Sequence, residues 1–155
     1  MQWANDYQEN QIVIVFDSMW HGTRRMAEYI GEGIRAADKD VTIKIFNAAK
    51  TDKNDILTEV FKSKAILVGS PTINKGVSYA IMGILEMMKG LAFKNKKAAA
   101  FGAYGWSGES AKIISEELSK AGFTVVNDPI KELWNPDDEA LDRCMEFGKD
   151  FVGKI

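Results

Sequence analysis

The feature that most constrains the fold is a regular alternation between short strand-like runs and longer segments with helical spacing. Apolar runs at 12–16, 65–69 and 97–103 are each followed by apolar residues three and four positions apart, as on one face of a helix. The pattern predicts strands at 12–16, 41–46, 65–69, 97–103 and 123–130, and helices at 23–35, 52–62, 78–89, 108–120 and 137–152. Five strand–helix units in series predict an α/β fold, with a parallel sheet covered by helices on both faces.

The composition of the strands predicts their order in the sheet. The first, third and fourth are continuously apolar, as expected for strands that are buried on both faces. The second alternates between apolar and polar residues, and the fifth contains Pro129, which sheets tolerate chiefly at their edges. The prediction is therefore a doubly wound five-stranded sheet of order 2-1-3-4-5. In such sheets ligands bind outside the carboxyl ends of the strands at the switch point, here between the first and third strands.

The segment after the first strand contains the residues of an anion site. Ser18 and Thr23 supply hydroxyl groups, Gly22 allows close approach of the backbone, and the helix predicted to begin near Thr23 supplies unpaired N–H groups. The segment lacks the Gly-Lys-Ser/Thr ending of a nucleotide-triphosphate loop. Arg24 and Arg25 fall in the first helical turn, where the helix dipole disfavours each cation by roughly 0.3–1 kcal/mol. Either a bound dianion offsets this cost, or both side chains point into water.

Two further loops at the same predicted edge are rich in hydroxyl groups, glycine and aromatic rings. The loop from Ser70 to Gly76 is long for a strand–helix connection, and such loops are often functional. The next loop places Tyr104 and Trp106 between glycines, where they form either a platform for a flat ring or a plug over the sheet end. A phosphate site beside an aromatic slot favours FMN as the cofactor. The residues of these three loops are therefore the candidates for binding the cofactor.

Another glycine pattern is rejected as a nucleotide site. The segment Gly31-Glu32-Gly33-Ile34-Arg35-Ala36 has the letters of a dinucleotide-binding fingerprint. It lies inside the first predicted helix and not at the strand-to-helix turn, so its glycines cannot meet a pyrophosphate. Close packing against the sheet is the role that we predict for them.

Composition excludes several other classes of protein. The net charge of −2 leaves no broad basic surface for nucleic acid, and no apolar stretch reaches the length needed to cross a membrane. A single histidine, His21, rules out a Cys/His zinc site. The only cysteine, Cys144, rules out an internal disulfide and permits a cytoplasmic location. It falls among apolar residues of the last predicted helix, so we expect a buried, unreactive thiol.

Three segments, DSMWHGTRRMA, VGSPTINKG and AFGAYGWSGES, occur in this order at the three predicted loops. Together they resemble the flavodoxin-like domain of flavodiiron proteins, the A-type flavoproteins that reduce oxygen or nitric oxide. The resemblance makes residues 12–155 the expected flavodoxin-like domain. Residues 1–11 resemble the segment that joins this domain to the metallo-β-lactamase-like domain of the family, and are expected to be a linker. Two positions depart from the family pattern: His21 stands where many members have glycine, and Ser78-Tyr79 where a Leu-Pro pair is common.

The resemblance implies an FMN-binding module for electron transfer. Residues 18–23 would hold the phosphate and ribityl end, and residues 71–74 and 103–108 would lie on the two sides of the isoalloxazine. The cofactor-binding residues predicted on this basis are Ser18, Met19, Trp20, His21, Gly22, Thr23, Ser70, Pro71, Thr72, Ile73, Asn74, Lys75, Gly76, Ala103, Tyr104, Gly105, Trp106, Ser107 and Gly108. The implied partners are a diiron metallo-β-lactamase-like domain, in cis or in a partner subunit, and rubredoxin or a rubredoxin-like reductant, with a homodimer as the assembly. One histidine cannot supply the diiron ligands, so the chain is expected to be an excised or stand-alone electron-transfer part. Lys75 either raises the midpoint potential of the second one-electron step or is simply solvated.

Two other functions can be weighed against this one. A flavodoxin-like NAD(P)H:quinone oxidoreductase needs room for a nicotinamide or quinone over the ring, and it stays as the alternative. A phosphate-sensing switch of the response-regulator type needs an aspartate at the end of the third strand. This chain has Gly69-Ser70-Pro71 at that point, so the switch is excluded.

Overall fold

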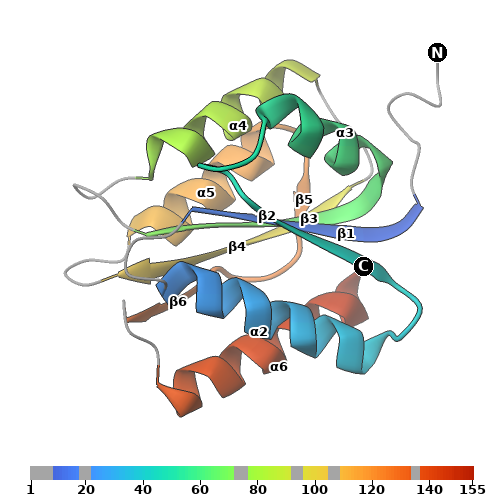
Figure 1. The fold of residues 1–155 in the computed structure, drawn as a ribbon, viewed down its shortest axis with the longest axis vertical. Coiled ribbons are helices and arrows are strands. Elements are labelled where there is room, and N and C mark those ends of the chain that lie inside the picture. The colour runs from blue at the N-terminus through green and yellow to red at the C-terminus, as the bar shows by residue number, and fades with distance from the viewer. Residues whose placement is uncertain (1–8, 18–21, 72–76, 92–95, 105–108, 134–136) are drawn as a thin grey trace.

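The computed structural model describes residues 9–17, 22–71, 77–91, 96–104, 109–133 and 137–155, which form one parallel sheet between two layers of helices (Figure 1). The strands are β1 (Glu9–Phe16), β2 (Thr42–Asn47), β3 (Ser63–Pro71), β4 (Lys97–Tyr104), β5 (Thr124–Val125) and β6 (Ile130–Leu133). The helices are α2 (Gly22–Ala37), α3 (Lys53–Lys62), α4 (Tyr79–Leu91), α5 (Glu109–Lys120) and α6 (Asp138–Lys154). The predicted α/β class is therefore confirmed.

The strand order is β2-β1-β3-β4-β5, with β6 also paired to β4, and every pairing is parallel. The predicted order 2-1-3-4-5 is confirmed, including the switch point between β1 and β3. The three strands predicted to be inner are the inner ones, and their apolar residues are buried because helices cover both faces.

Side chains alternate between two cores, one on each face of the sheet. Val13 of β1 and Ile66 of β3 belong to the core under α3, α4 and α5, whereas Ile14 and Leu67 belong to the core under α2 and α6. In Figure 1 the first set of helices lies above the sheet and the second set below it. This period of two is the reason that a continuously apolar strand can serve both layers.

The prediction of a single last strand at 123–130 is wrong in one respect. The segment forms two short strands, β5 and β6, and both pair with β4, so the described residues form a sheet of six strands instead of five. Val126-Asn127-Asp128-Pro129 separates them. Proline has no backbone N–H to donate to a ladder, so pairing stops before Pro129 and resumes at Ile130. The placement of this segment at the sheet margin is confirmed.

Local signals explain where the helices begin and end. The side chain of Asp52 accepts a hydrogen bond from the Asn54 amide at the start of α3, and Asp137 accepts one from the Ala140 amide at the start of α6. Both carboxylates satisfy amides that have no partner inside the helix. After α5 the chain turns at Gly122, whose φ of 100° is in the left-handed region that favours glycine.

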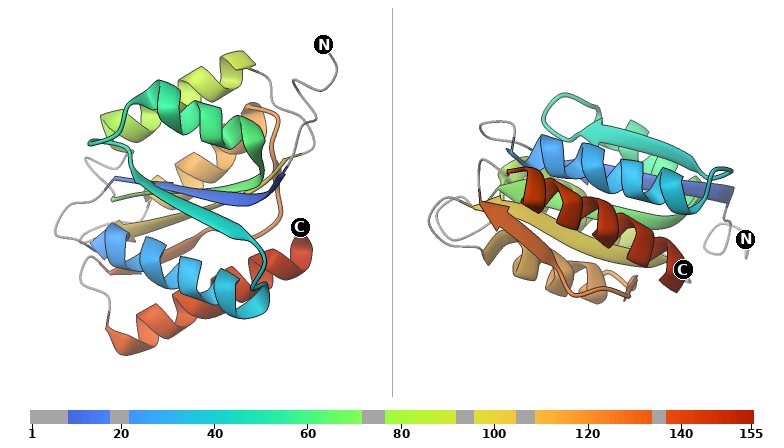
Figure 2. Two further views of the ribbon diagram at one scale, coloured as in Figure 1. Left: turned by 45° about the vertical axis from the view of Figure 1, so that its right-hand side comes forward. Right: turned by 90° about the horizontal axis from the view of Figure 1, so that it is seen from below.

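The helices α2 and α6 lie side by side on one face of the sheet (Figure 2). Gly31 faces the sheet as predicted, because a Cβ added there would be in ordinary contact with Ile14 and Ile45. For Gly33 the prediction of packing on the sheet is wrong, because this glycine lies against the backbone of α6. Gly148 of α6 lies in turn against the backbone of α2, so the two helices approach closely through both glycines.

None of the helices within the described ranges is both long and apolar enough to span a bilayer.

Candidate functional site

The strands β1, β3 and β4 end at one edge of the sheet, which we call the carboxyl-end rim and define by Phe16, Pro71 and Tyr104. Phe16 pairs with Gly69, and Pro71 pairs with Ala103, so the three ends are adjacent. The Asp17 amide donates to the Gly69 carbonyl oxygen at 3.1 Å and continues the β1–β3 pairing to the end of β1. The three loops that the sequence singled out therefore begin at one place, the switch point of the sheet.

The start of α2 carries the strongest sign of an anion site. Thr23 is fully buried, and its hydroxyl oxygen has no hydrogen-bond partner among the described residues. The first turn of α2 contains no acidic residue, and the first amides of any helix lack intrahelical acceptors. A buried hydroxyl without a partner costs about 1–3 kcal/mol unless a ligand pairs with it. A phosphate oxygen would satisfy both the hydroxyl and the helix amides.

Arg24 takes part in an exposed ion pair on the same helix. Its guanidinium lies 3.3 Å from a Glu28 carboxylate oxygen, and both side chains are more than half exposed. The two residues also line a depression of about 380 Å³ beside the start of α2, together with Phe16, Ile45, Asn47 and Lys50. Arg24 and the rim residue Phe16 therefore line the same depression.

A cluster of buried serines lies at the end of β3 and near the starts of α4 and α5. Ser70, at the end of β3, donates its hydroxyl to the Pro71 carbonyl oxygen at 2.8 Å and accepts from the Ser78 amide at 3.0 Å. Ser110, in the first turn of α5, donates its hydroxyl to the Ser70 carbonyl oxygen at 2.9 Å. The three serines are each no more than 3% exposed. The predicted site residue Ser70 therefore has its hydroxyl engaged inside the protein.

Two glycines allow close packing near the ends of β3 and β4, one on each face of the sheet. A Cβ at Gly69 would lie 2.1 Å from the ring of Phe101. A Cβ at Gly102 would lie 2.6 Å from the Ser110 hydroxyl oxygen and 2.8 Å from the Ser70 carbonyl oxygen. Neither position accepts a side chain without moving its neighbours. Glycine is therefore required at Gly69 beside Phe101, which belongs to the core under α2 and α6, and at Gly102, where β3, β4 and α5 meet.

The predicted site residues divide into two groups. Gly22, Thr23, Ser70, Pro71, Ala103 and Tyr104 lie within the described residues, all at the ends of β3 and β4 or the start of α2. The remaining predicted residues lie outside the described residues, and these are Ser18, Met19, Trp20, His21, Thr72, Ile73, Asn74, Lys75, Gly76, Gly105, Trp106, Ser107 and Gly108.

Sequence reasoning missed the end of β6, which also reaches the rim. Glu132 pairs with Ala103 in the β4–β6 register and receives two hydrogen bonds of 2.8 Å from the Arg143 guanidinium. This pair joins β6 to α6. The residues Lys131 and Glu132 gave no strand signal because both are charged, and the pairing of Glu132 with Arg143 is a tertiary effect.

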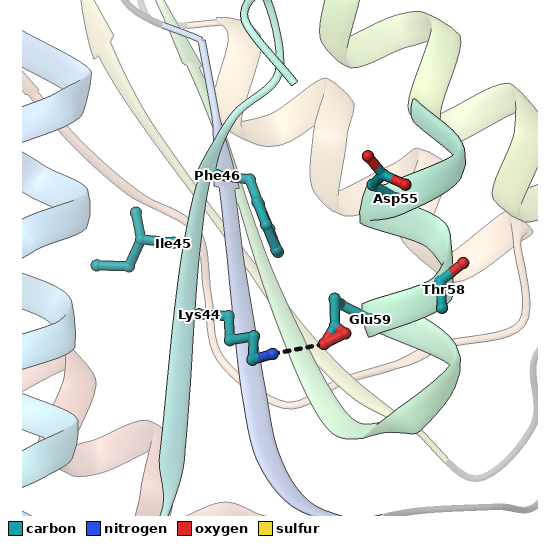
Figure 3. A pocket seen from close by; sticks show the side chains of 6 residues that line it. All are labelled: Lys44, Ile45, Phe46, Asp55, Thr58 and Glu59. Carbon is teal, nitrogen blue, oxygen red and sulfur yellow. Dashed lines mark hydrogen bonds and ion pairs between the residues drawn. The ribbon is translucent and has the colours of Figure 1, made fainter. Parts of the chain in front are cut away.

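A second depression, of about 500 Å³, lies between β2 and α3, away from the predicted loops (Figure 3). Its lining residues are Lys44, Ile45, Phe46, Asp55, Thr58 and Glu59. The Lys44 ammonium donates to Glu59 at 2.8 Å, and this hydrogen bond is the main reason that the pKa of Glu59 is lowered. The depression contains no predicted site residue. Within the described ranges, no three His, Cys, Asp or Glu side chains gather in a group that could hold a metal ion.

A doubly wound sheet of this order, with an anion-ready helix start at the switch point, defines a flavodoxin-like α/β protein. The flavodoxin family model matches residues 14–148. The chain belongs to the flavodoxin family.

Its relatives include flavodiiron proteins. An anaerobic nitric oxide reductase flavorubredoxin of Escherichia coli O1:K1 / APEC is 47% identical over 152 residues, which cover 98% of this chain and 32% of the relative. Rubredoxin oxygen:oxidoreductase of Desulfovibrio gigas is 34% identical with a TM-score of 0.91, over 98% of this chain and 37% of that one. An archaeal flavodoxin is 30% identical with a TM-score of 0.82, over 93% of this chain and 97% of that one.

The predicted resemblance to the flavodoxin-like domain of flavodiiron proteins is confirmed by these matches. The chain spans about a third of the length of the curated relatives. Membership of the flavodoxin family also supports the predicted cofactor, FMN.

Proposed function

We propose that this chain binds FMN at the carboxyl-end rim and carries electrons as the flavodoxin-like module of a flavodiiron oxygen or nitric oxide reductase. The observation that carries the proposal is the buried Thr23 hydroxyl, which lacks a partner at the start of α2. An FMN phosphate offers acceptor oxygens and negative charge, which suit this hydroxyl and the positive end of the helix.

The carboxyl-end rim also offers a place for the isoalloxazine ring of FMN. Pro71 ends β3 and Tyr104 ends β4, so the two loops predicted to hold the isoalloxazine leave the sheet from neighbouring strands. When bound, FMN supplies the electron-transfer chemistry, and the protein binds it and sets its potentials. The chain's part would be to hold the phosphate at Thr23 and the ring between the two loops.

The partners in this proposal are those of the flavodiiron relatives. Electrons would come from rubredoxin or a rubredoxin-like reductant, and would leave for a diiron site in a metallo-β-lactamase-like domain, in cis or in the partner subunit of a homodimer. Two relatives carry rubredoxin in their names, a flavorubredoxin and a rubredoxin oxygen:oxidoreductase. A cytoplasmic location is part of the same proposal.

The alternative is a stand-alone NAD(P)H:quinone oxidoreductase on the same fold. The two functions differ in their reductant, so anaerobic stopped-flow mixing separates them. The FMN-loaded chain should be reduced by reduced rubredoxin, whereas NADH alone should leave its absorbance near 450 nm, about where oxidised flavins absorb, unchanged over the same time. Rapid bleaching by NADH would support the reductase instead.

The residue Lys75 lies outside the described residues, and its role stays a prediction. If it raises the midpoint potential of the second one-electron step, Lys75→Glu should lower that potential in a redox titration. An unchanged or higher value would leave Lys75 as a solvated side chain.

A further inference from the structure

We propose that the Ser110–Ser70 hydrogen bond is a positioning device that fixes, relative to each other, the ends of the two loops expected to flank the FMN ring. This inference rests on the proposed function. It assigns a role to Ser110, which lies outside the predicted cofactor-binding residues, and gives Ser70 a role other than direct contact with the cofactor.

The Ser70 hydroxyl joins the two ends of one loop. It donates to the carbonyl oxygen of Pro71, the last residue before the loop at 72–76, and accepts from the amide of Ser78, two residues after it. The Ser78 hydroxyl in turn accepts from the Ile81 amide at 3.4 Å in the first turn of α4. One hydroxyl thereby fixes the exit of β3 relative to the entry of α4.

The Ser110 hydroxyl connects this unit to the other loop. Ser110 lies two residues after the loop at 105–108, and its hydroxyl donates to the Ser70 carbonyl oxygen at 2.9 Å. Ser70 also pairs with Gly102 in the β3–β4 register. The hydrogen bond therefore connects α5 to β3 at the point where β3 pairs with β4. Both serines are no more than 1% exposed, so water does not compete for this hydrogen bond.

The packing around this hydrogen bond leaves no room for a side chain at Gly102. A Cβ at Gly102 would approach both the Ser110 hydroxyl oxygen and the Ser70 carbonyl oxygen to less than 3 Å. Any side chain at this position would therefore push α5 away from β3. Because the phosphate site at Thr23 lies on α2, on the opposite face of the sheet from α5, a change in this spacing should act on the ring end alone.

The test compares the affinities of the apo-protein for FMN and for inorganic phosphate, by calorimetry, in Ser110→Ala, Gly102→Ala and the wild type. Loss of one buried hydrogen bond should weaken FMN binding about three- to tenfold in Ser110→Ala, with at least as large an effect in Gly102→Ala. Inorganic phosphate affinity should stay unchanged in both variants. The midpoint potentials of bound FMN should also shift, because the ring environment changes.

Two controls make the result specific. Ser119→Ala removes an exposed serine from the last turn of the same helix and should leave every quantity unchanged. Circular dichroism checks that each variant is folded. Gly102→Ala disturbs the Ser110–Ser70 hydrogen bond while both serine hydroxyl groups remain in the protein.

Three outcomes would decide against the device. If both variants bind FMN with the affinity and the midpoint potentials of the wild type, the positioning role is overturned and the proposed function is unaffected. Equal losses of FMN and phosphate affinity would also overturn it, because they indicate a general structural role. A wild-type protein that binds no FMN would instead refute the proposed function, and the device with it.

Discussion

Gly33 of α2 lies directly against the backbone of Met145 of α6, at a distance that leaves no room for a side chain. A Cβ at Gly33 would stand 2.0 Å from the Met145 carbonyl oxygen. Gly33→Ala should therefore destabilise the protein by about 1–3 kcal/mol or more, because the two helices must separate to admit the methyl group. Urea unfolding followed by circular dichroism measures the change.

The matched control for this prediction is Gly153→Ala, in the last turn of α6. A Cβ at Gly153 would have no atom within 4 Å. Alanine is the better helix former by about 0.5–1 kcal/mol, so this variant should be as stable as the wild type or slightly more stable. Equal stability of the two variants would contradict the close helix contact.

Thr23→Val should weaken cofactor binding without lowering the stability of the protein. Valine has nearly the shape of threonine but no hydroxyl, so it removes a buried polar atom that has no partner among the described residues. The apo-protein should be as stable as the wild type or more stable. FMN and inorganic phosphate should both bind about 10- to 100-fold more weakly, because a hydrogen bond to a charged group is worth roughly 1.5–3 kcal/mol. Unchanged affinity for both ligands would place the phosphate elsewhere.

Lys96 should make stability depend on pH in the alkaline range. Its ammonium is 1% exposed, donates to the Phe61 and Ser63 carbonyl oxygens at 2.9 and 2.5 Å, and burial lowers its pKa from 10.5 to about 8. Between these two values the unfolded chain binds more protons than the folded one, so this group adds stability as the pH rises from about 8 to 10.5. Below about pH 8 the contribution is constant.

The Lys96→Met variant isolates that contribution. The free energy of unfolding of the wild type minus that of the variant should increase from about pH 8 to pH 10.5, by at most about 3 kcal/mol. The two carbonyl acceptors favour the charged form and reduce the rise. Wild-type and variant curves that run parallel across this range would show that the Lys96 pKa is not lowered by folding.

Cys144 should react with thiol reagents only when the protein unfolds. It is fully buried in α6, and burial, with a smaller contribution from Glu132, raises its pKa to about 12. The thiolate is the reactive form, so at about pH 8 the folded protein should consume no Ellman's reagent on the time scale on which the unfolded chain reacts completely. Fast labelling under native conditions would contradict the burial of this helix face.

The main course of the fold was predictable because the inner strands carry an unambiguous signal. Val13, Ile14 and Leu67 belong to apolar runs that only a strand covered on both faces requires. The division of the last strand was not predictable from periodicity, since Ile130 and Glu132 form a strand only beside β4 and with the support of Arg143. The contact of Gly33 with α6 depends on the geometry of two helices far apart in sequence.

The candidate site was predictable to the level of loops. Parallel strands end at one edge, so the order of the strands alone brings Thr23, Pro71 and Tyr104 to the same rim. The functions of single hydroxyls were not predictable. Ser70 and Thr23 look alike in sequence, yet the hydroxyl of Ser70 makes hydrogen bonds inside the protein, and that of Thr23 has no partner in the part of the chain that the structure describes.

The most direct test of FMN binding is the visible spectrum of the purified chain, followed by mass analysis of the flavin released on denaturation. The prediction is a yellow protein, or an apo-protein that becomes yellow with added FMN, that holds one FMN per chain and releases a flavin with the mass of FMN. A folded protein that stays colourless after incubation with excess FMN and gel filtration would contradict it.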